Sequence, residues 1–151
     1  MQAADVLGGV RRLERGLRLA ARAAERSTGL TAAQLFVLEQ LALAESSSIA
    51  DLAARTHTDR SSVSVVIDRL AAAGLVKCSP SSDDRRRTET EITKRGRAVL
   101  GRAPLSPTTG LVRAVSRLPA TKVRQLAATL AALNEQLGYT EEAMLFDEEK
   151  K

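Results

Sequence analysis

Between residues 60 and 69 the sequence places short hydroxyl side chains, a valine and two arginines where they could read DNA. A serine hydroxyl can approach a base edge and donate or accept a hydrogen bond, a valine can meet a thymine methyl group, and an arginine can bind guanine or a phosphate. The residues of this set are Arg60, Ser61, Ser62, Ser64, Val65 and Arg69. Any solvated helix face carries similar residues, so the set alone leaves both interpretations open.

A second group with chemical potential follows in a polar stretch, where Arg85, Arg86 and Arg87 are consecutive. Arginines on a flexible loop suit the narrow minor groove, whose negative potential attracts guanidinium groups. Asp84 can brace Arg86, two residues further on. The alternative is a solvated run of charge in a mobile loop, but its position soon after a DNA-reading helix favours contact with DNA.

The first group needs a helix to present it, and the apolar spacing predicts one over residues 59–73. Asp59 is a suitable N-cap and Gly74 a suitable residue after the last turn. A single apolar stripe at i, i+3, i+4 and i+7 would face inward and leave the polar set outside. The stripe consists of Val63, Val66, Ile67 and Leu70.

A shorter helix over residues 49–55 precedes it, because Ser48 and Asp51 have the spacing of a capping box. His57 and Thr58 form the turn between the two helices, which together predict a helix-turn-helix. Ser47 and Ser48, at a helix N-terminus, are expected to hold a phosphate. Lys77 is a weaker phosphate candidate.

The second group needs a hairpin. Residues 75–78 and 88–93 are predicted as paired strands around the polar loop 79–87. The expected fold class is therefore mainly α with a small β wing. This arrangement is a winged helix-turn-helix.

Further helices are expected on both sides of this unit. A helix over residues 31–44 would begin with a capping box of Thr31 and Gln34, and Pro104, Pro107 and Pro119 would interrupt the later helices. Helices near residues 5–26 and 123–137 carry apolar residues at alternating spacings of three and four, typical of a helix–helix seam. The seam residues are Val6, Val10, Leu13, Leu17, Ala20 and Ala24 in the first helix, and Val123, Leu126, Leu130, Leu133 and Leu137 in the second. Two such seams favour an intertwined homodimer, and packing within one monomer is the alternative.

Four regions are expected from this pattern. They are an N-terminal dimerisation helix (1–30), a winged helix-turn-helix (31–96), C-terminal dimerisation helices (97–138) and an acidic tail (139–151) that contains Met144, Leu145 and Phe146.

Composition narrows the classes of function. A net charge of +5 and a pI near 10 favour a polyanionic partner. An aromatic content of 2% disfavours single-strand binding, which relies on aromatic stacking. No catalytic constellation or phosphate-binding glycine loop is visible, so neither an enzyme nor a cofactor is expected. His57 lacks partners at ligand spacing, which disfavours a metal site.

No apolar run of about 20 residues is present, so a cytoplasmic protein is expected. Cys78 is the single cysteine. It could act as an oxidant sensor if positive charge lowered its thiol pKa, with Lys77 beside it and the arginines across the hairpin. An incidental residue is the preferred interpretation.

The run from Asp59 to Val76, DRSSVSVVIDRLAAAGLV, resembles the recognition helix of multiple-antibiotic-resistance-type (MarR) transcriptional regulators. The segments Asp84–Arg87 and Glu91–Gly96 are similar to the wing of that family and its exit, with the family's Asp-x-Arg motif at Asp84 and Arg86. The resemblance implies a homodimeric winged-helix repressor or activator whose first and last helices form the dimer interface. Small ligands often bind between the dimer and DNA-reading lobes of such regulators, so an effector of unknown identity is expected.

These observations predict a sequence-specific regulator that binds double-stranded DNA as a homodimer, most simply as a repressor released by a small ligand. Helix 59–73 would enter the major groove and the wing the adjacent minor groove. The operator would be a pseudo-palindrome with half-sites about 10 bp apart. A non-specific architectural DNA-binding protein and a redox-sensing regulator that uses Cys78 remain the alternatives.

Overall fold

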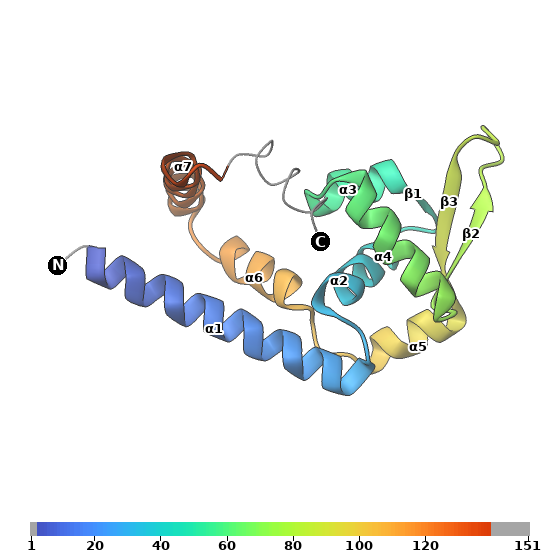
Figure 1. Ribbon diagram of the computed structural model, residues 1–151, viewed down its shortest axis with the longest axis horizontal. Helices are drawn as coiled ribbons and strands as arrows, with labels where there is room; N and C mark the ends of the chain where they lie inside the picture. The colour runs from blue at the N-terminus through green and yellow to red at the C-terminus, as the bar shows by residue number, and fades with distance from the viewer. Residues whose placement is uncertain (1–2, 140–151) are drawn as a thin grey trace. The chain divides into compact units, whose positions relative to one another are not determined.

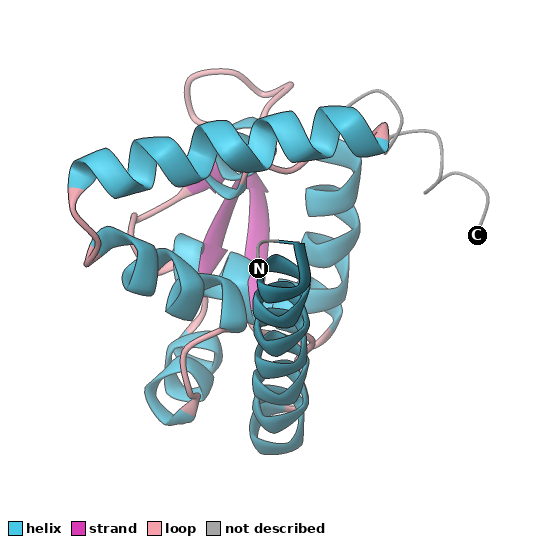
Figure 2. Cartoon of the chain, turned by 90° about the vertical axis from the view of Figure 1, so that its left-hand side faces the viewer, coloured by secondary structure: helices cyan, strands magenta, loops and turns pink. Residues whose placement is uncertain are grey.

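The computed structural model describes residues 3–139, which are mostly helical with a small antiparallel sheet (Figures 1 and 2). The predicted fold class, mainly α with a small β wing, is confirmed. The predicted tail and its three apolar residues at 144–146 lie outside the described residues. Within the described part, no helix is both long and apolar enough to cross a membrane.

The chain begins with two helices, α1 (Ala3–Thr28) and α2 (Ala32–Leu41). Gly29 separates them with a φ of +73°, which an L side chain rarely adopts. Thr31 and Gln34 form the predicted capping box, in which Gln34 N donates to Thr31 Oγ1 at 3.2 Å and Thr31 N donates to Gln34 Oε1 at 3.0 Å. α2 ends three residues before the predicted boundary at residue 44, and a turn follows it.

The helix-turn-helix consists of α3 (Ile49–Thr56) and α4 (Arg60–Ala72), and its bounds agree with the prediction to within one residue. A hairpin follows, formed by β2 (Val76–Pro80) and β3 (Thr88–Ile92). The sequence did not predict the two-residue strand β1 (Ser47–Ser48), which pairs with β3 at Ser47↔Thr90. The three antiparallel strands lie in the order β1-β3-β2.

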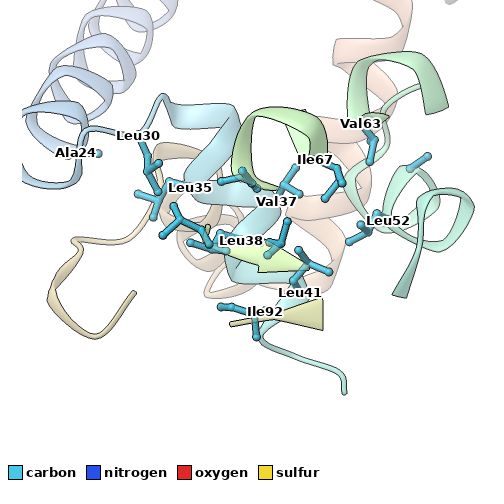
Figure 3. Packing of buried hydrophobic residues seen from close by; sticks show 14 residues of the cluster. Ala24, Leu30, Leu35, Val37, Leu38, Leu41, Leu52, Val63, Ile67 and Ile92 are labelled. Carbon is cyan, nitrogen blue, oxygen red and sulfur yellow. The ribbon is translucent and has the colours of Figure 1, made fainter. Parts of the chain in front are cut away.

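One hydrophobic core joins α2, α3, α4 and the sheet (Figure 3). α2 lies at its centre, because Leu35, Leu38 and Leu41 are all buried. The stripe predicted for α4 is buried at Val63, Ile67 and Leu70 and only half-buried at Val66. α4 therefore has a fixed inner face, and its opposite face is left to solvent.

The chain leaves the hairpin through α5 (Lys94–Arg102), which begins at the N-cap Thr93. The predicted interruption at Pro104 and Pro107 is confirmed, because α5 stops at Arg102 and a new helix, α6 (Pro107–Ser116), starts at the second proline. α7 (Ala120–Leu137) follows the predicted break at Pro119.

The chain divides into two compact units, Met1–Gly110 and a second that starts at Leu111. In the first unit, the seam predicted along α1 is exposed over most of its length, and only Ala24 at its end is buried. In the second unit, α7 has no buried residue, and its predicted seam is exposed from Leu126 to Leu137.

Candidate nucleic-acid interface

The turn between α3 and α4 sets the start of the predicted DNA-reading helix. His57 ends α3 in the left-handed conformation at φ +51°, and Asp59 then caps α4. The Asp59 carboxylate accepts from the backbone N–H of Ser62 at 2.8 Å, which satisfies one free N–H group of the first turn. This cap fixes the residue at which α4 begins, and therefore which side chains face outward.

The outer face of α4 carries most of the predicted base-reading residues. Arg60, Ser61, Val65 and Arg69 are exposed, and Ser64 is half-buried. The structure thus brings these side chains onto one face, opposite the buried stripe. Arginines lie at both ends of this face, and the smaller side chains of Ser61, Ser64 and Val65 lie between them. Small side chains suit close approach to base edges in the major groove.

Ser62 occupies a different position from the one the sequence predicted for a base-reading residue. Its hydroxyl donates to Asp59 Oδ2 at 2.7 Å, and the side chain is half-buried. The same two bonds to Ser62 hold the pKa of Asp59 below its ordinary value of 3.8. Ser62 therefore supports the start of α4 through two hydrogen bonds to the Asp59 carboxylate.

The wing presents its three arginines at the tip of the hairpin, where Arg85, Arg86 and Arg87 are all exposed. Asp84 stabilises the tip by accepting two backbone hydrogen bonds. Its Oδ1 accepts from the backbone N–H of Arg86 at 2.9 Å, and its carbonyl accepts from the N–H of Arg87 at 2.9 Å. The brace predicted for Asp84 is therefore made to the backbone of Arg86, which leaves the guanidinium group free to reach outward. The loop is closed by Ser81 N, which donates to the carbonyl of Arg87 at 2.8 Å.

Hydrogen bonds at the end of the hairpin hold the wing beside α4 (Figure 1). Thr93 donates its hydroxyl to the carbonyl of Gly74 at 2.8 Å, and its N–H donates to the carbonyl of Leu75 at 3.0 Å. The end of the hairpin is thereby bonded to the turn that follows α4. Lys77, the weaker phosphate candidate, forms an exposed ion pair with Glu91 at 3.0 Å across the strands.

Ser47 and Ser48 do not offer the phosphate contact that the sequence predicted. Their exposed fractions are only 3% and 4%, because β1 pairs with β3. Ser48 Oγ accepts from Asp51 N at 3.1 Å and donates to Asp51 Oδ2 at 2.7 Å, and Ser47 Oγ accepts from the guanidinium of Arg55. We therefore correct both assignments, since the two hydroxyls are bonded within the fold.

The capping box at the start of α3 also has an electrostatic effect. The hydroxyl and N–H of Ser48 hold the pKa of Asp51 below its ordinary value, and the charges of Arg87 and Arg55 act in the same direction. Arg87 belongs to the wing, so its charge is felt at the first helix of the helix-turn-helix.

Comparison with known proteins identifies this arrangement. The model of the MarR family matches residues 28–87, from the end of α1 to the tip of the wing. The winged-helix region of the chain, from the end of α1 through the wing arginines, is therefore similar to the MarR family. No curated protein matches the sequence.

Solved structures of MarR-family and related regulators share the fold over nearly the whole chain. The transcriptional regulator BldR from Sulfolobus solfataricus is 25% identical, with a TM-score of 0.59, and the match covers 93% of this chain and 100% of BldR. Sco3205, a MarR family transcriptional regulator from Streptomyces coelicolor solved in complex with DNA, is 22% identical, with a TM-score of 0.66 and coverage of 91% and 93%. A MepR-like protein complexed with pseudoligands is 24% identical, with a TM-score of 0.65 and coverage of 93% and 100%.

Cys78 is exposed on β2, opposite Thr90. Its Sγ lies 3.7 Å from Thr90 Oγ1. The expectation that the wing arginines lie across the hairpin from it is wrong, because the register places Thr90 there and the arginines in the loop beyond Thr88. Its neighbour Lys77 is paired with Glu91. Cys78 therefore faces a threonine across the strands, and the wing arginines lie further along the hairpin.

Three residues that support the candidate interface were not singled out from the sequence. Arg55 donates to Ser47 Oγ and to the carbonyl of Gln40 at 3.2 Å, and so ties α3 to β1 and α2. Thr93 links the wing to α4, and Glu39 accepts hydrogen bonds from residues that follow α5. Only Thr93 carried a local signal, since it has the type and position of an N-cap before α5.

Proposed function

We propose that this chain is a MarR-family, sequence-specific transcriptional regulator that binds double-stranded DNA as a homodimer. The observation that supports the proposal most is the exposed outer face of α4. A wing with three exposed arginines follows it in the sequence, and its first strand contacts α4. α4 would enter the major groove and the wing the neighbouring minor groove. The complex of Sco3205 with DNA supports the same use of the fold.

Each group on this surface has a proposed role. Ser61, Ser64 and Val65 would read base edges, and Arg60 and Arg69 would bind guanine or phosphate. Arg86 would occupy the minor groove, with Asp84 holding its backbone, and Arg85 and Arg87 would bind the flanking phosphates. Ser62 now supports the helix start, so it is not among the base-reading residues.

The dimer would bring two α4 helices to a pseudo-palindromic operator with half-sites about 10 bp apart. We further propose that it acts in the cytoplasm as a repressor that a small ligand releases. The MepR-like relative complexed with pseudoligands supports a ligand-binding capacity of the fold.

Arg86→Ala tests this proposal. Because the change removes one charged minor-groove contact, we expect operator affinity to fall by about 10- to 100-fold at fixed salt. The slope of log affinity against log salt should also become shallower by about 0.9, since one fewer phosphate charge is neutralised. A gel-shift titration on the chain's own selected operator measures both quantities.

Arg22→Ala is the matched control, since it removes the same charge from an exposed position on α1. It should leave affinity nearly unchanged. Equal affinity of Arg86→Ala and the wild type would contradict the proposed role of the wing. Equal binding of the wild type to operator and to random DNA of the same length would instead favour the architectural alternative.

A further inference from the structure

A single carboxylate on α2 receives several hydrogen bonds from the segment between α5 and α6. Glu39 Oε1 accepts from the backbone N–H of Ser106 at 2.7 Å, and Glu39 Oε2 accepts from the Ser106 hydroxyl at 2.6 Å. The hydroxyl of Thr109 also donates to Glu39 Oε2. These contacts join residues 67 to 70 positions apart in the sequence, so they are tertiary contacts and not local turn geometry.

The segment that Glu39 holds is the start of α6. The Ser106 side chain is fully buried, and its Oγ accepts from the backbone N–H of Thr109 at 3.1 Å, so Ser106 acts as the N-cap. A negative charge at a helix N-terminus is favourable, because the unpaired N–H groups and the helix dipole point toward it. Glu39 therefore fixes both the position of the cap and the direction in which α6 begins.

The chemistry of the linker makes this anchor important. Pro104 and Pro107 on either side have restricted φ angles and no N–H, so they cannot form the hydrogen bonds that would continue α5 into α6. Leu105 between them is exposed and does not pack in the core. The bonds to Glu39 are thus the main polar attachment of the linker to α2, and they lie just before Leu111, where the second unit begins.

We propose that Glu39 is a positioning residue that fixes the path by which α6 leaves the winged-helix unit, and thereby the spacing between the two α4 helices of the dimer. This role rests on the proposed function, since half-site spacing has meaning only for a dimer on DNA. Glu39 itself does not touch DNA. Its effect would be on which operators the dimer accepts, and not on the contacts that each α4 makes.

The experiment measures affinity of the full chain for a series of operators in which the two half-sites are moved apart or together in single base-pair steps. A single half-site is measured beside them. We expect the wild type to prefer one spacing sharply, and Glu39→Ala to reduce by about tenfold the ratio between the best spacing and one changed by two base pairs. Binding to the single half-site should change little, because α4 and its core contacts are intact.

Two further variants keep the test independent of folding defects in Glu39→Ala. Glu39→Gln preserves the side-chain shape and weakens the acceptor, so it should show a smaller flattening of the spacing profile. Ser106→Ala with Thr109→Val removes the two hydroxyl donors and leaves Glu39 in place, and it should flatten the profile as well. Glu45→Ala is the matched control, because it removes an exposed carboxylate just beyond α2 that makes no hydrogen bond or ion pair in the part of the chain the structure covers.

The outcomes separate the two levels of inference. An unaltered spacing profile in the Glu39 variants and in Ser106→Ala with Thr109→Val would overturn the role of Glu39 and leave the proposed function intact. An equal loss of affinity on the single half-site and on every spacing would also overturn it, because that result indicates general destabilisation. Failure of the wild type to bind any operator would overturn the proposed function and this role together.

Discussion

Ser61 and Ser62 are adjacent and of the same type, yet they have different roles in this fold. Ser61 is exposed on the outer face of α4, whereas the Ser62 hydroxyl is bonded to Asp59 at 2.7 Å. The sequence indicated the helix face but could not distinguish the two, because an N-cap carboxylate can accept from the backbone alone or also from a hydroxyl. The serines at 47 and 48 show the same difficulty, since their burial depends on a strand 40 residues further along the chain.

The Asp59 cap makes the stability of the chain depend on pH. Hydrogen bonds from Ser62 lower the pKa of this carboxyl in the folded chain, so its ionised form stabilises the fold above the ordinary value of 3.8. That contribution is lost as the pH falls below 3.8 and through the folded pKa. Asp59→Asn keeps a good N-cap but cannot ionise, so its free energy of unfolding should depend less on pH across that range. Urea unfolding at pH 6 and at pH 3 measures the difference.

Asp68→Asn is the control on the same helix, since Asp68 is exposed and makes no hydrogen bond or ion pair within residues 3–139. Its pH dependence should match that of the wild type. If Asp59→Asn and the wild type lost stability in parallel between the two pH values, the bonds from Ser62 would not favour the ionised carboxylate as described.

At the scale of elements, the close approach of α5 to the turn between α4 and β2 requires a glycine. A Cβ at Gly96 would lie 2.2 Å from the carbonyl oxygen of Leu75 and 2.7 Å from Ile92 Cγ1. The first of these is a backbone atom that cannot move aside without shifting the turn after Gly74. Gly96 therefore lets α5 pack directly against the base of the hairpin, at Leu75 and Ile92.

Gly96→Ala should destabilise the chain by about 1–3 kcal/mol or more, because the added methyl group overpacks this contact. Gly101→Ala is the matched control in the same helix, since a Cβ there meets nothing within 4 Å. It should leave stability unchanged or raise it by up to about 1 kcal/mol through helix propensity. Thermal unfolding of the two variants gives the comparison, and equal melting temperatures would contradict the close approach.

The elements that the sequence predicted well are those with local signals. Caps at Thr31, Ser48 and Asp59 and the proline breaks after α5 follow from residue types within a few positions. β1 could not be predicted in this way, because a strand of two residues has no periodicity and exists only through its pairing with β3. The contacts of Arg55 and Glu39 could not be predicted for the same reason. Arg55 bonds to Ser47 of β1, and Glu39 bonds to Ser106, 67 positions further along the chain.

At the scale of the whole molecule, each unit presents an apolar helix face to solvent. On α1, the side chains of Val6, Val10 and Leu13 are at least half exposed. On α7, Leu137 is 54% exposed and Leu130 is 48% exposed. Extended apolar surface of this kind usually marks an interaction site. The apolar stripes are visible in the sequence from their spacing, whereas their partner is not, because spacing does not distinguish packing within a chain from packing between two chains.

We expect the chain to sediment at micromolar concentration with about twice its mass of 16.2 kDa. Leu130→Glu should shift it toward the monomer, because it places a charge within an apolar interface. Gln125→Glu is the control, since it adds the same charge beside the stripe of α7. A wild-type species of monomer mass would contradict the proposed dimer.

The position of β2 at the edge of the sheet affects how the protein behaves when it is concentrated. An edge strand has unpaired backbone groups that can recruit a strand from another molecule and start aggregation. Here β2 carries a charged lysine at 77 and ends at Pro80, which has no N–H to donate. These two features of β2 disfavour edge-to-edge association of the wing with another molecule.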